Sequence, residues 1–458
     1  MKKSFISATI LLLLFLFNST IMAQNLVGPW KGELEIPTGK LTVIFHIKHD
    51  NNRFSGTMDV PEQGGKGIPI HSITYQNPFL TIELPNLGIK YVGNVLDDDN
   101  IEGTFQQAGA SLPLHLKKSL EVILGKPKPQ EPQAPFPYIS TNVTFQNGNV
   151  TLSGTLTRPK ENKKYPAVIL ITGSGPQDRN HEILGHKPFL LLADQLTRSG
   201  FAVLRFDDRG TAKSTGEFAN STTYDFADDV AEAFHFLSKR TDIDPQKIGL
   251  LGHSEGGIVA SITYEKVPQV GFIILMASPG VKGKDLMLLQ KKVIDEKSNV
   301  PPAVVARDQK IFGEAYDMIV RKEQPLYDRL KEYFKHQLNV QVSDKQIHNI
   351  ALSLSNPWFT EFIRLDPATY FQKVKCPVLA LNGSKDVQVV ASQNLPAIES
   401  ALQKAGNKHF KIVELEGLNH LFQKCETGLP NEYGQIEQTL SPFLLDEIKK
   451  WIVFNTEQ

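Results

Sequence analysis

A serine flanked by glycines lies between two apolar runs in the middle of the chain. The stretch "LLGHSEGGIVAS" covers residues 250–261 and places Ser254 between Gly252 and Gly256. A strand before this serine and a helix after it would present its hydroxyl at the end of a sheet, on a tight turn that requires glycine nearby. The alternative is a glycine-rich turn with an incidental serine. The strand–turn–helix context favours a nucleophile.

A serine hydroxyl is a weak nucleophile unless a base and an orienting carboxylate accompany it. Of twelve histidines, His420 is the best candidate base, because it follows the last apolar run, 410–415. Asp386 follows the preceding apolar run. Asp386 alone could cap a helix and His420 alone could be a loop histidine. The order Ser254, Asp386, His420, each after a predicted strand, matches the α/β-hydrolase order of nucleophile, acid and base and predicts a catalytic triad.

Acyl transfer also requires donors for the developing oxyanion. The stretch "ITGSGPQDRN", residues 171–180, follows the first central apolar run and contains two glycines. We expect one donor to be the backbone N–H of Ser174 and the other to be the N–H of Glu255, the residue after the nucleophile. The Glu255 side chain is not expected to take part. This chemistry requires neither a metal nor a cofactor.

The elements around these residues form an alternating pattern from residue 139 to residue 458, the expected catalytic domain. Near-continuous apolar runs, typical of strands covered on both faces, alternate with helical stretches and predict a mostly parallel sheet flanked by helices. These runs are 150–156, 167–172, 202–206, 248–252, 271–277, 377–383 and 410–415.

One interval, 280–371, contains helical patterns without a strand and predicts a helical cap inserted over the sheet. Its amphipathic stretches 286–296 and 326–338 offer apolar faces that could cover a pocket. The alternative is that these faces pack on each other.

A different pattern precedes the catalytic domain. Short runs that alternate apolar and polar residues over 24–120 predict a small antiparallel β domain, a barrel or a sandwich. Trp30 is expected in its core. A proline-rich linker, 121–138, follows.

The first 23 residues have the features of a secretory signal peptide. Lys2 and Lys3 precede a short apolar run, 8–17, and small or polar residues follow to Ala23. We therefore expect a secreted or periplasmic protein, with no stable membrane insertion after removal of this segment. A retained N-terminal anchor is the alternative. No cysteine lies near the predicted cleavage site, so a lipid anchor is not expected.

Composition excludes some partners. The chain has 458 residues, with 49 basic and 49 acidic side chains. Without a field of one sign, neither nucleic acid nor an anionic membrane surface is an expected partner. The two cysteines, Cys376 and Cys425, are expected to be free thiols.

Six segments of the region from about residue 137 onward carry a family resemblance. They are "GSGPQDRN" (173–180), "FDDRG" (206–210), "GHSEGG" (252–257), "NGSKD" (382–386), "GLNHLFQ" (417–423) and the tail 427–442. With these motifs the region resembles α/β-hydrolases of the bacterial secreted carboxylesterase type, close to the serine aminopeptidase-like branch. The resemblance implies hydrolysis of short-chain carboxylic esters through an acyl-enzyme, with a small-molecule ester as substrate and no cofactor. Ala212 stands where related hydrolases often have a second glycine.

Two other functions stay open at this point. A serine peptidase of the same fold would use the same triad, because the triad does not distinguish an ester from an amide. A ligand-binding protein would use the β domain to hold a carbohydrate or a lipid, with the hydrolase as an accessory.

Overall fold

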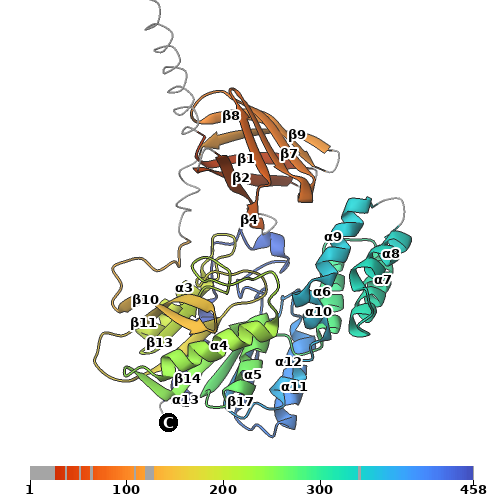
Figure 1. Ribbon diagram of the computed structural model, residues 1–458. Helices are drawn as coiled ribbons and strands as arrows, with labels where there is room; N and C mark the ends of the chain where they lie inside the picture. Colours follow the sequence, from red (N-terminus) through yellow and green to blue (C-terminus); the bar gives the residue numbers. More distant parts are fainter. Residues whose placement is uncertain are drawn as a thin grey trace, which may run out of the picture. The chain divides into compact units, whose positions relative to one another are not determined.

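The computed structural model divides into two compact units, which we describe separately (Figure 1). One comprises Met1–Pro127 with Ile183–Gly185, and the other comprises Lys128–Glu182 with His186–Gln458. The expected signal peptide, 1–23, and the first part of the expected linker lie outside the described residues. The structure describes residues 26–36, 39–50, 53–61, 65–107, 110–118, 128–338 and 342–456.

The first unit contains an antiparallel sheet of nine strands in the order β4-β3-β2-β1-β9-β8-β7-β6-β5. The sheet curls on itself, because the Ile70 N–H donates to the Gly56 carbonyl of β3 at 3.0 Å just before β5 begins. Its interior is filled by large side chains, among them the fully buried Trp30, Phe45 and Tyr91. The elements are β1 (Gly28–Ile36), β2 (Gly39–Asp50), β3 (Arg53–Val60), β4 (Gly65–Pro69), β5 (Ser72–Gln76), β6 (Phe79–Leu84), the short 3-10 helix η2 (Pro85–Leu87), β7 (Ile89–Val95), β8 (Asn100–Gln107) and β9 (Ala110–Lys118).

The second unit contains an eight-stranded sheet in the order β10-β11-β13-β12-β14-β15-β16-β17. β11 is antiparallel to both of its neighbours, and the strands from β13 to β17 in this order are parallel. This sheet, preceded by the antiparallel β unit, confirms the predicted fold class. The strands are β10 (Ile139–Asn147), β11 (Val150–Arg158), β12 (Tyr165–Ile171), β13 (Ala202–Phe206), β14 (Ile243–His253), β15 (Phe272–Met276), β16 (Val378–Gly383) and β17 (Phe410–Leu415).

Helices cover both faces of this sheet (Figure 1). Apolar residues of α3 and α13 form one core with one face of the sheet, and those of α4, α5 and α12 form a second core with the other face. This double coverage explains why the parallel strands are apolar almost throughout. The bounds are α3 (Pro188–Arg198), α4 (Thr223–Ser238), α5 (Glu255–Lys266), α12 (Ala391–Lys404), the 3-10 helix η4 (Pro430–Glu432) and α13 (Pro442–Thr456).

Six helices occupy the described part of the interval between β15 and β16. They have a core of their own, which includes the fully buried Leu330 and Phe334 of α8. The apolar face of 326–338 therefore packs within the insertion, which was the alternative to covering a pocket. The bounds are α6 (Gly283–Lys297), α7 (Pro302–Val320), α8 (Leu326–Leu338), α9 (Asp344–Ser355), α10 (Pro357–Arg364) and α11 (Ala368–Phe371).

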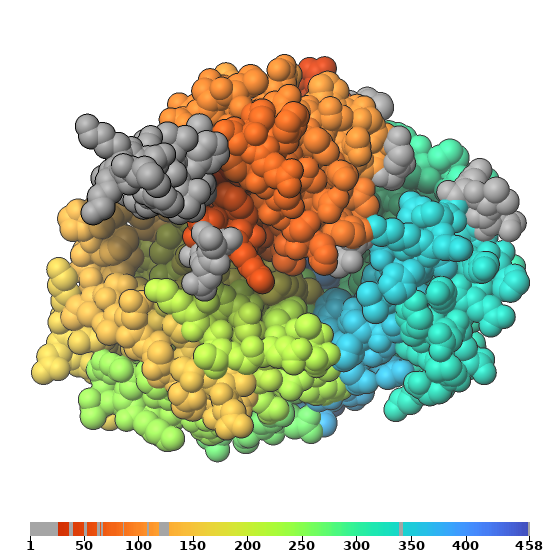
Figure 2. All heavy atoms as spheres, turned by 45° about the horizontal axis from the view of Figure 1, so that its top comes forward, coloured from red at the N-terminus to blue at the C-terminus, as the bar shows by residue number. Residues whose placement is uncertain are grey.

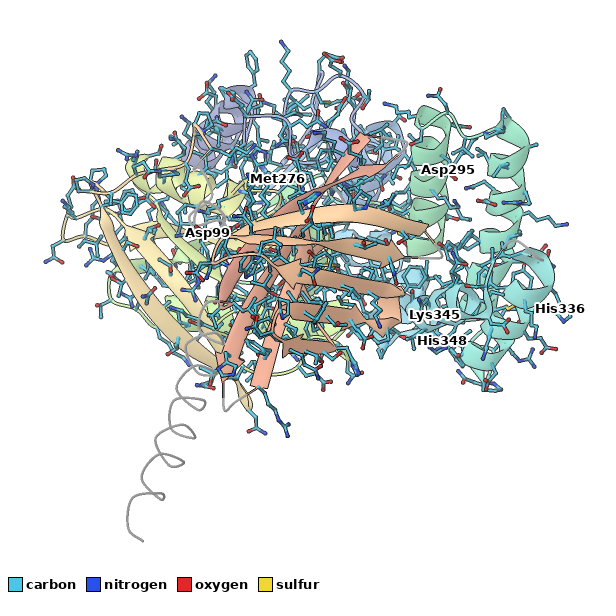
Figure 3. The ribbon with its side chains drawn as sticks, turned by 90° about the horizontal axis from the view of Figure 1, so that it is seen from above. Asp99, Met276, Asp295, His336, Lys345 and His348 are labelled. Carbon is cyan, nitrogen blue, oxygen red and sulfur yellow. The ribbon has the colours of Figure 1, made fainter. Side chains whose placement is uncertain are left out.

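The insertion joins the rest of its unit through its inner helices. Phe362 of α10 and Phe371 of α11 belong to the core shared with α4, α5 and α12. In the space-filling view, the cyan insertion is continuous with the blue segments that follow it (Figure 2). His336 of α8 and His348 of α9 lie well to one side of Met276, the last residue of β15 (Figure 3). The outer helices are thus lateral to the end of the central strands.

The loop after β13 has a residue in an unusual conformation. Ala212 has a φ of 47°, in the left-handed region that favours glycine. Because glycine lacks the Cβ that makes this region costly, Ala212→Gly is expected to stabilise the protein by about 1 kcal/mol. The midpoint of thermal unfolding of this variant should be higher than that of the wild type. Ala231→Gly, inside α4, is the matched control and should lower stability by about 1 kcal/mol. Lower midpoints for both variants would contradict the strain argument.

Candidate active site

Ser254 lies at a sharp turn between a strand and a helix. β14 ends at His253 and α5 begins at Glu255, while Ser254 itself has φ 55° and ψ −124°. Its N–H donates to the Met276 carbonyl at 2.8 Å, which anchors the strained turn to the neighbouring strand. A Cβ on Gly252 would lie 2.1 Å from the carbonyl oxygen of Gly256. Glycine before the serine is therefore required by close approach of the backbone.

Asp386 and His420 are in direct contact. The Asp386 Oδ2 and His420 Nδ1 atoms are 2.8 Å apart, and both side chains are buried. Because a carboxylate accepts, Nδ1 carries the proton and Nε2 is left as the basic nitrogen. The other carboxylate oxygen, Oδ1, accepts from the backbone N–H groups of Gln388 at 2.8 Å and Val389 at 2.9 Å. These bonds hold Asp386 in the turn after β16.

A second histidine holds the loop that carries His420. The His253 Nε2 donates to the His420 carbonyl oxygen at 2.9 Å, and the two ring centroids are 4.8 Å apart. Burial, together with the nearby His420 and His181, holds the pKa of His253 well below its usual value. His253 therefore stays neutral beside the imidazolium that His420 would form. The sequence analysis missed this contact, because the two residues are 167 positions apart.

The Ser254 hydroxyl and the His420 Nε2 have no hydrogen-bond partner among the residues that the structure describes. His253 precedes Ser254 in the chain, and its ring contacts His420, so the loop that carries His420 packs against the residue next to the serine. Contacts between a nucleophile and its base are often loose before a substrate binds. The arrangement thus leaves a free hydroxyl and a free basic nitrogen at the end of the sheet.

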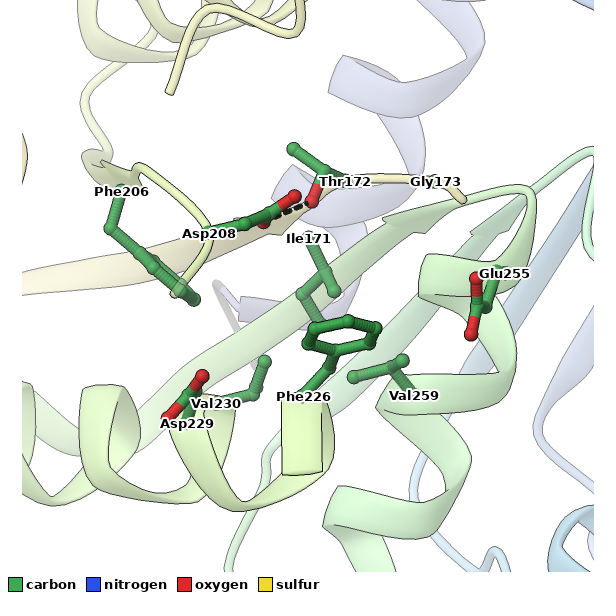
Figure 4. Close-up of a pocket in the computed structure, with 10 residues that line it drawn as sticks. All are labelled: Ile171, Thr172, Gly173, Phe206, Asp208, Phe226, Asp229, Val230, Glu255 and Val259. Atoms are coloured by element: carbon green, nitrogen blue, oxygen red, sulfur yellow. Dashed lines mark hydrogen bonds between the residues drawn. The ribbon is translucent and has the colours of Figure 1, made fainter. Parts of the chain in front are cut away.

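The loop after β12 offers N–H groups to the site. Within the described part of the chain, neither the N–H of Ser174 nor that of Glu255 donates to an acceptor. The "FDDRG" segment braces this loop: the Asp208 carboxylate accepts from the Thr172 hydroxyl at 2.6 Å and from the Gln177 N–H at 2.9 Å (Figure 4). Burial raises the pKa of Asp208 to about 8. Two N–H groups are therefore unused, one in this loop and one at the start of α5, and the loop has a rigid support.

A buried ion pair fixes the far end of the same loop. Asp207 accepts from the Arg179 Nε at 2.9 Å and Nη2 at 2.6 Å, and from the Arg179 N–H at 2.8 Å. Burial opposes ionisation of Asp207, but these hydrogen bonds outweigh it and hold the pKa of the carboxyl below its ordinary value. The pair therefore contributes stability above the pKa of Asp207 in the unfolded chain, and this contribution is lost as the pH falls through the lower folded-state pKa.

Asp207→Asn is expected to lower the free energy of unfolding at pH 7 by about 3 kcal/mol, because Arg179 loses its buried partner. The difference between wild type and variant should be smaller at pH 3, below the ordinary pKa of an aspartate, because the wild type has by then lost part of this contribution. Urea unfolding at both pH values measures this. Glu161→Gln, which removes an exposed partner of Lys163, is the control and should change nothing measurable. An equal deficit at both pH values would contradict the assignment.

The described residues show no metal site and no membrane-spanning helix. Among the described residues, no group of three or more His, Cys, Asp or Glu side chains could hold a metal ion. Within the same ranges, no helix combines the length and apolar character that crossing a bilayer requires. Cys376 and Cys425 are free thiols.

Comparison with known proteins points to one family. The sequence profile of the family described as "Serine aminopeptidase, S33" matches residues 187–424, which include Ser254, Asp386 and His420. Esterase EstD of Thermotoga maritima is 25% identical over 320 residues, which are 68% of this chain and 68% of that protein. An uncharacterised 31.7 kDa protein of Escherichia coli is 24% identical over 230 residues, 50% of this chain and 75% of that protein.

Solved structures of esterases are also similar. Est1E from Butyrivibrio proteoclasticus with bound ferulic acid is 16% identical, with a TM-score of 0.42, over 69% of this chain and 100% of that one. The Pyrococcus furiosus esterase Pf2001 is 16% identical, with a TM-score of 0.41, over 70% of this chain and 91% of that one.

Proposed function

Because the chain belongs to the serine aminopeptidase S33 family of α/β-hydrolases, we propose that it is a serine esterase that cleaves short-chain carboxylic esters through an acyl-enzyme. Ser254 is the nucleophile, His420 the base and Asp386 the residue that orients the base. The observation that carries this proposal is the bond between Asp386 and His420 Nδ1, which leaves Nε2 as an acceptor on a loop that His253, the residue before Ser254, contacts.

The chemistry uses groups of this chain alone. The Ser254 Oγ attacks the ester carbonyl carbon while its proton passes to His420 Nε2. The oxyanion of the tetrahedral intermediate accepts from the N–H groups of Ser174 and Glu255. Collapse of the intermediate expels the alcohol, which takes the proton from His420. Water then attacks the acyl-enzyme by the same proton transfer and releases the acid and the free serine.

Ester hydrolysis is preferred over peptide hydrolysis as the proposed activity. The relative from Thermotoga maritima is named an esterase and aligns over two thirds of both chains. The family's own description names an aminopeptidase, so an amide substrate is the second activity to test. A ligand-binding role of the β unit has less support, because large side chains such as Trp30 and Tyr91 fill the interior of its sheet.

A substrate screen tests the proposal. The purified protein should hydrolyse p-nitrophenyl esters, with the highest kcat/KM for short acyl chains, and should turn over aminoacyl p-nitroanilides far more slowly. A fluorophosphonate probe should label Ser254, as read by peptide mass spectrometry. A higher kcat/KM for the anilides than for every ester would replace the esterase proposal with the peptidase. Labelling at another residue would overturn the assignment of the nucleophile.

We also propose that the protein is exported. The support is the charged start and short apolar run of residues 1–17, which lie outside the described part of the chain. Fractionation of expressing cells should find the mature protein outside the cytoplasm, beginning after Ala23. A full-length chain that sediments with membranes would instead indicate a retained anchor.

A further inference from the structure

The carboxyl group of Glu255 lies behind the nucleophile turn, and the proposed mechanism uses only the backbone N–H of this residue. The side chain is 2% exposed. Its Oε1 accepts from the Thr223 hydroxyl at 2.6 Å and from the Trp358 indole N–H at 2.9 Å. The Ser174 side chain also lowers the pKa of this carboxyl group, so it lies near it. One buried group thus takes two hydrogen bonds and has a third polar neighbour.

These three neighbours come from separate parts of the unit. Thr223 begins α4, Ser174 lies in the loop after β12, and Trp358 lies in α10 of the insertion. Ser174 and Glu255 also supply the two N–H groups proposed as oxyanion donors. The Glu255 carboxyl therefore connects the two residues that supply the proposed oxyanion donors to α10 of the insertion.

The surroundings of the carboxyl group favour its neutral form. Burial raises the pKa of Glu255, and its neutral neighbours Thr223, Trp358 and Ser174 only partly oppose this. No Lys or Arg pairs with Glu255 in the described ranges, and its Oε2 is buried without a partner. Glu255 also lines a cavity of about 20 Å³, together with Gly173 and Asp208 (Figure 4). That volume has room for one water, which could accept from a protonated Oε2.

Apolar contacts hold α10 against the sheet unit, and a directional hydrogen bond is needed to set how the helix faces the Ser254 turn. The Trp358 ring stacks on Phe362, with centroids 5.2 Å apart, and Phe362 lies in the core of the sheet unit. Apolar packing of this kind is non-directional, whereas the indole N–H must point at its acceptor. The bond from Trp358 to Glu255 therefore defines how this helix meets the nucleophile turn.

We propose that the Glu255 carboxyl is a positioning residue that fixes α10 and the Ser174 loop relative to Ser254, and so couples docking of the inserted helices to the geometry of the oxyanion donors. This inference rests on the proposed function, because it gives the Ser174 and Glu255 N–H groups a role in the reaction. Preorganised donors of this kind contribute about 10²- to 10³-fold each to kcat, so a small displacement of the loop has a large effect.

Two substitutions of Glu255 separate the effect of its hydrogen-bond acceptor from the effect of its size. Glu255→Leu removes the acceptor and should lower kcat for p-nitrophenyl butyrate by tenfold or more, roughly, with a smaller change in KM. Glu255→Gln keeps a carbonyl oxygen as the acceptor for Thr223 and Trp358 and should recover most of the lost kcat. Hydrogen exchange in residues 357–364 should be faster in the leucine variant and close to wild type in the glutamine variant.

Substitution from the insertion side tests the same bond without altering the nucleophile turn. Trp358→Phe removes the indole N–H and should lower kcat roughly two- to tenfold, the value of one hydrogen bond. Tyr333→Phe is the matched control, because it removes another hydrogen-bonding group of the insertion, one that donates to Glu314 and not to Glu255. The control should keep the wild-type kcat, KM and exchange of 357–364.

The outcomes distinguish this inference from the proposed function. If the leucine variant folds and keeps wild-type kcat and exchange, or if Trp358→Phe matches Tyr333→Phe, the positioning role is overturned while labelling of Ser254 still supports the esterase. A glutamine variant as slow as the leucine variant would also overturn it, because the charge and not the acceptor would then matter. If wild-type Ser254 resists the fluorophosphonate, the proposed function fails, and exchange in 357–364 still reports whether Glu255 holds α10.

Discussion

Replacing Ser254 with alanine is expected to abolish ester hydrolysis while the fold stays intact. Without Oγ no acyl-enzyme can form, and the loss in kcat should reach about 10⁴-fold or more. The turn itself should survive, because the Ser254 N–H bond to the Met276 carbonyl is a backbone contact. The side chain of Ser254 makes no hydrogen bond in the described part of the chain, so its removal leaves no buried group unpaired. Steady-state kinetics and thermal unfolding measure the two effects separately.

A second serine near the end of the same strands provides the control for this variant. Ser278 follows β15 and is buried, and its hydroxyl bonds weakly to the Pro279 carbonyl at 3.4 Å. Ser278→Ala should keep both the activity and the labelling by fluorophosphonate. Residual activity above one per cent in Ser254→Ala, after contaminating esterases are excluded by labelling, would argue for a different nucleophile.

The contact between Asp386 and His420 could be predicted from the sequence because both residues are tied to strand ends. Asp386 and His420 each follow an apolar run, and parallel strands bring their carboxyl ends to one edge of a sheet. The structure places these two side chains in contact and leaves the Ser254 hydroxyl free. The fold class followed from the same runs, because a strand covered on both faces is apolar throughout.

Contacts between segments that lie far apart in the sequence could not be predicted in this way. His253 reaches His420 across 167 positions, and Trp358 reaches Glu255 across 103. Neither contact produces a periodic pattern in the sequence, because each depends on how separate helices, strands and loops pack together. The insertion shows the same limit: periodicity identified the apolar face of 326–338, but not that its partners would be α7 and α9.

Asp386→Asn is expected to reduce kcat by about 10⁴-fold, through the tautomer of His420 rather than through the fold. The two backbone N–H groups of Gln388 and Val389 donate to Oδ1 and will keep the amide oxygen of asparagine there. The amide NH₂ must then face His420 Nδ1, which can pair with it only by giving up its own proton. Nε2 becomes the protonated nitrogen and can no longer accept from Ser254. Near-native thermal unfolding, together with much slower fluorophosphonate labelling, should accompany the loss. Asp228→Asn, which removes a half-exposed partner of Lys266, is the control and should leave kcat unchanged. A loss below tenfold in Asp386→Asn would mean that another group orients His420.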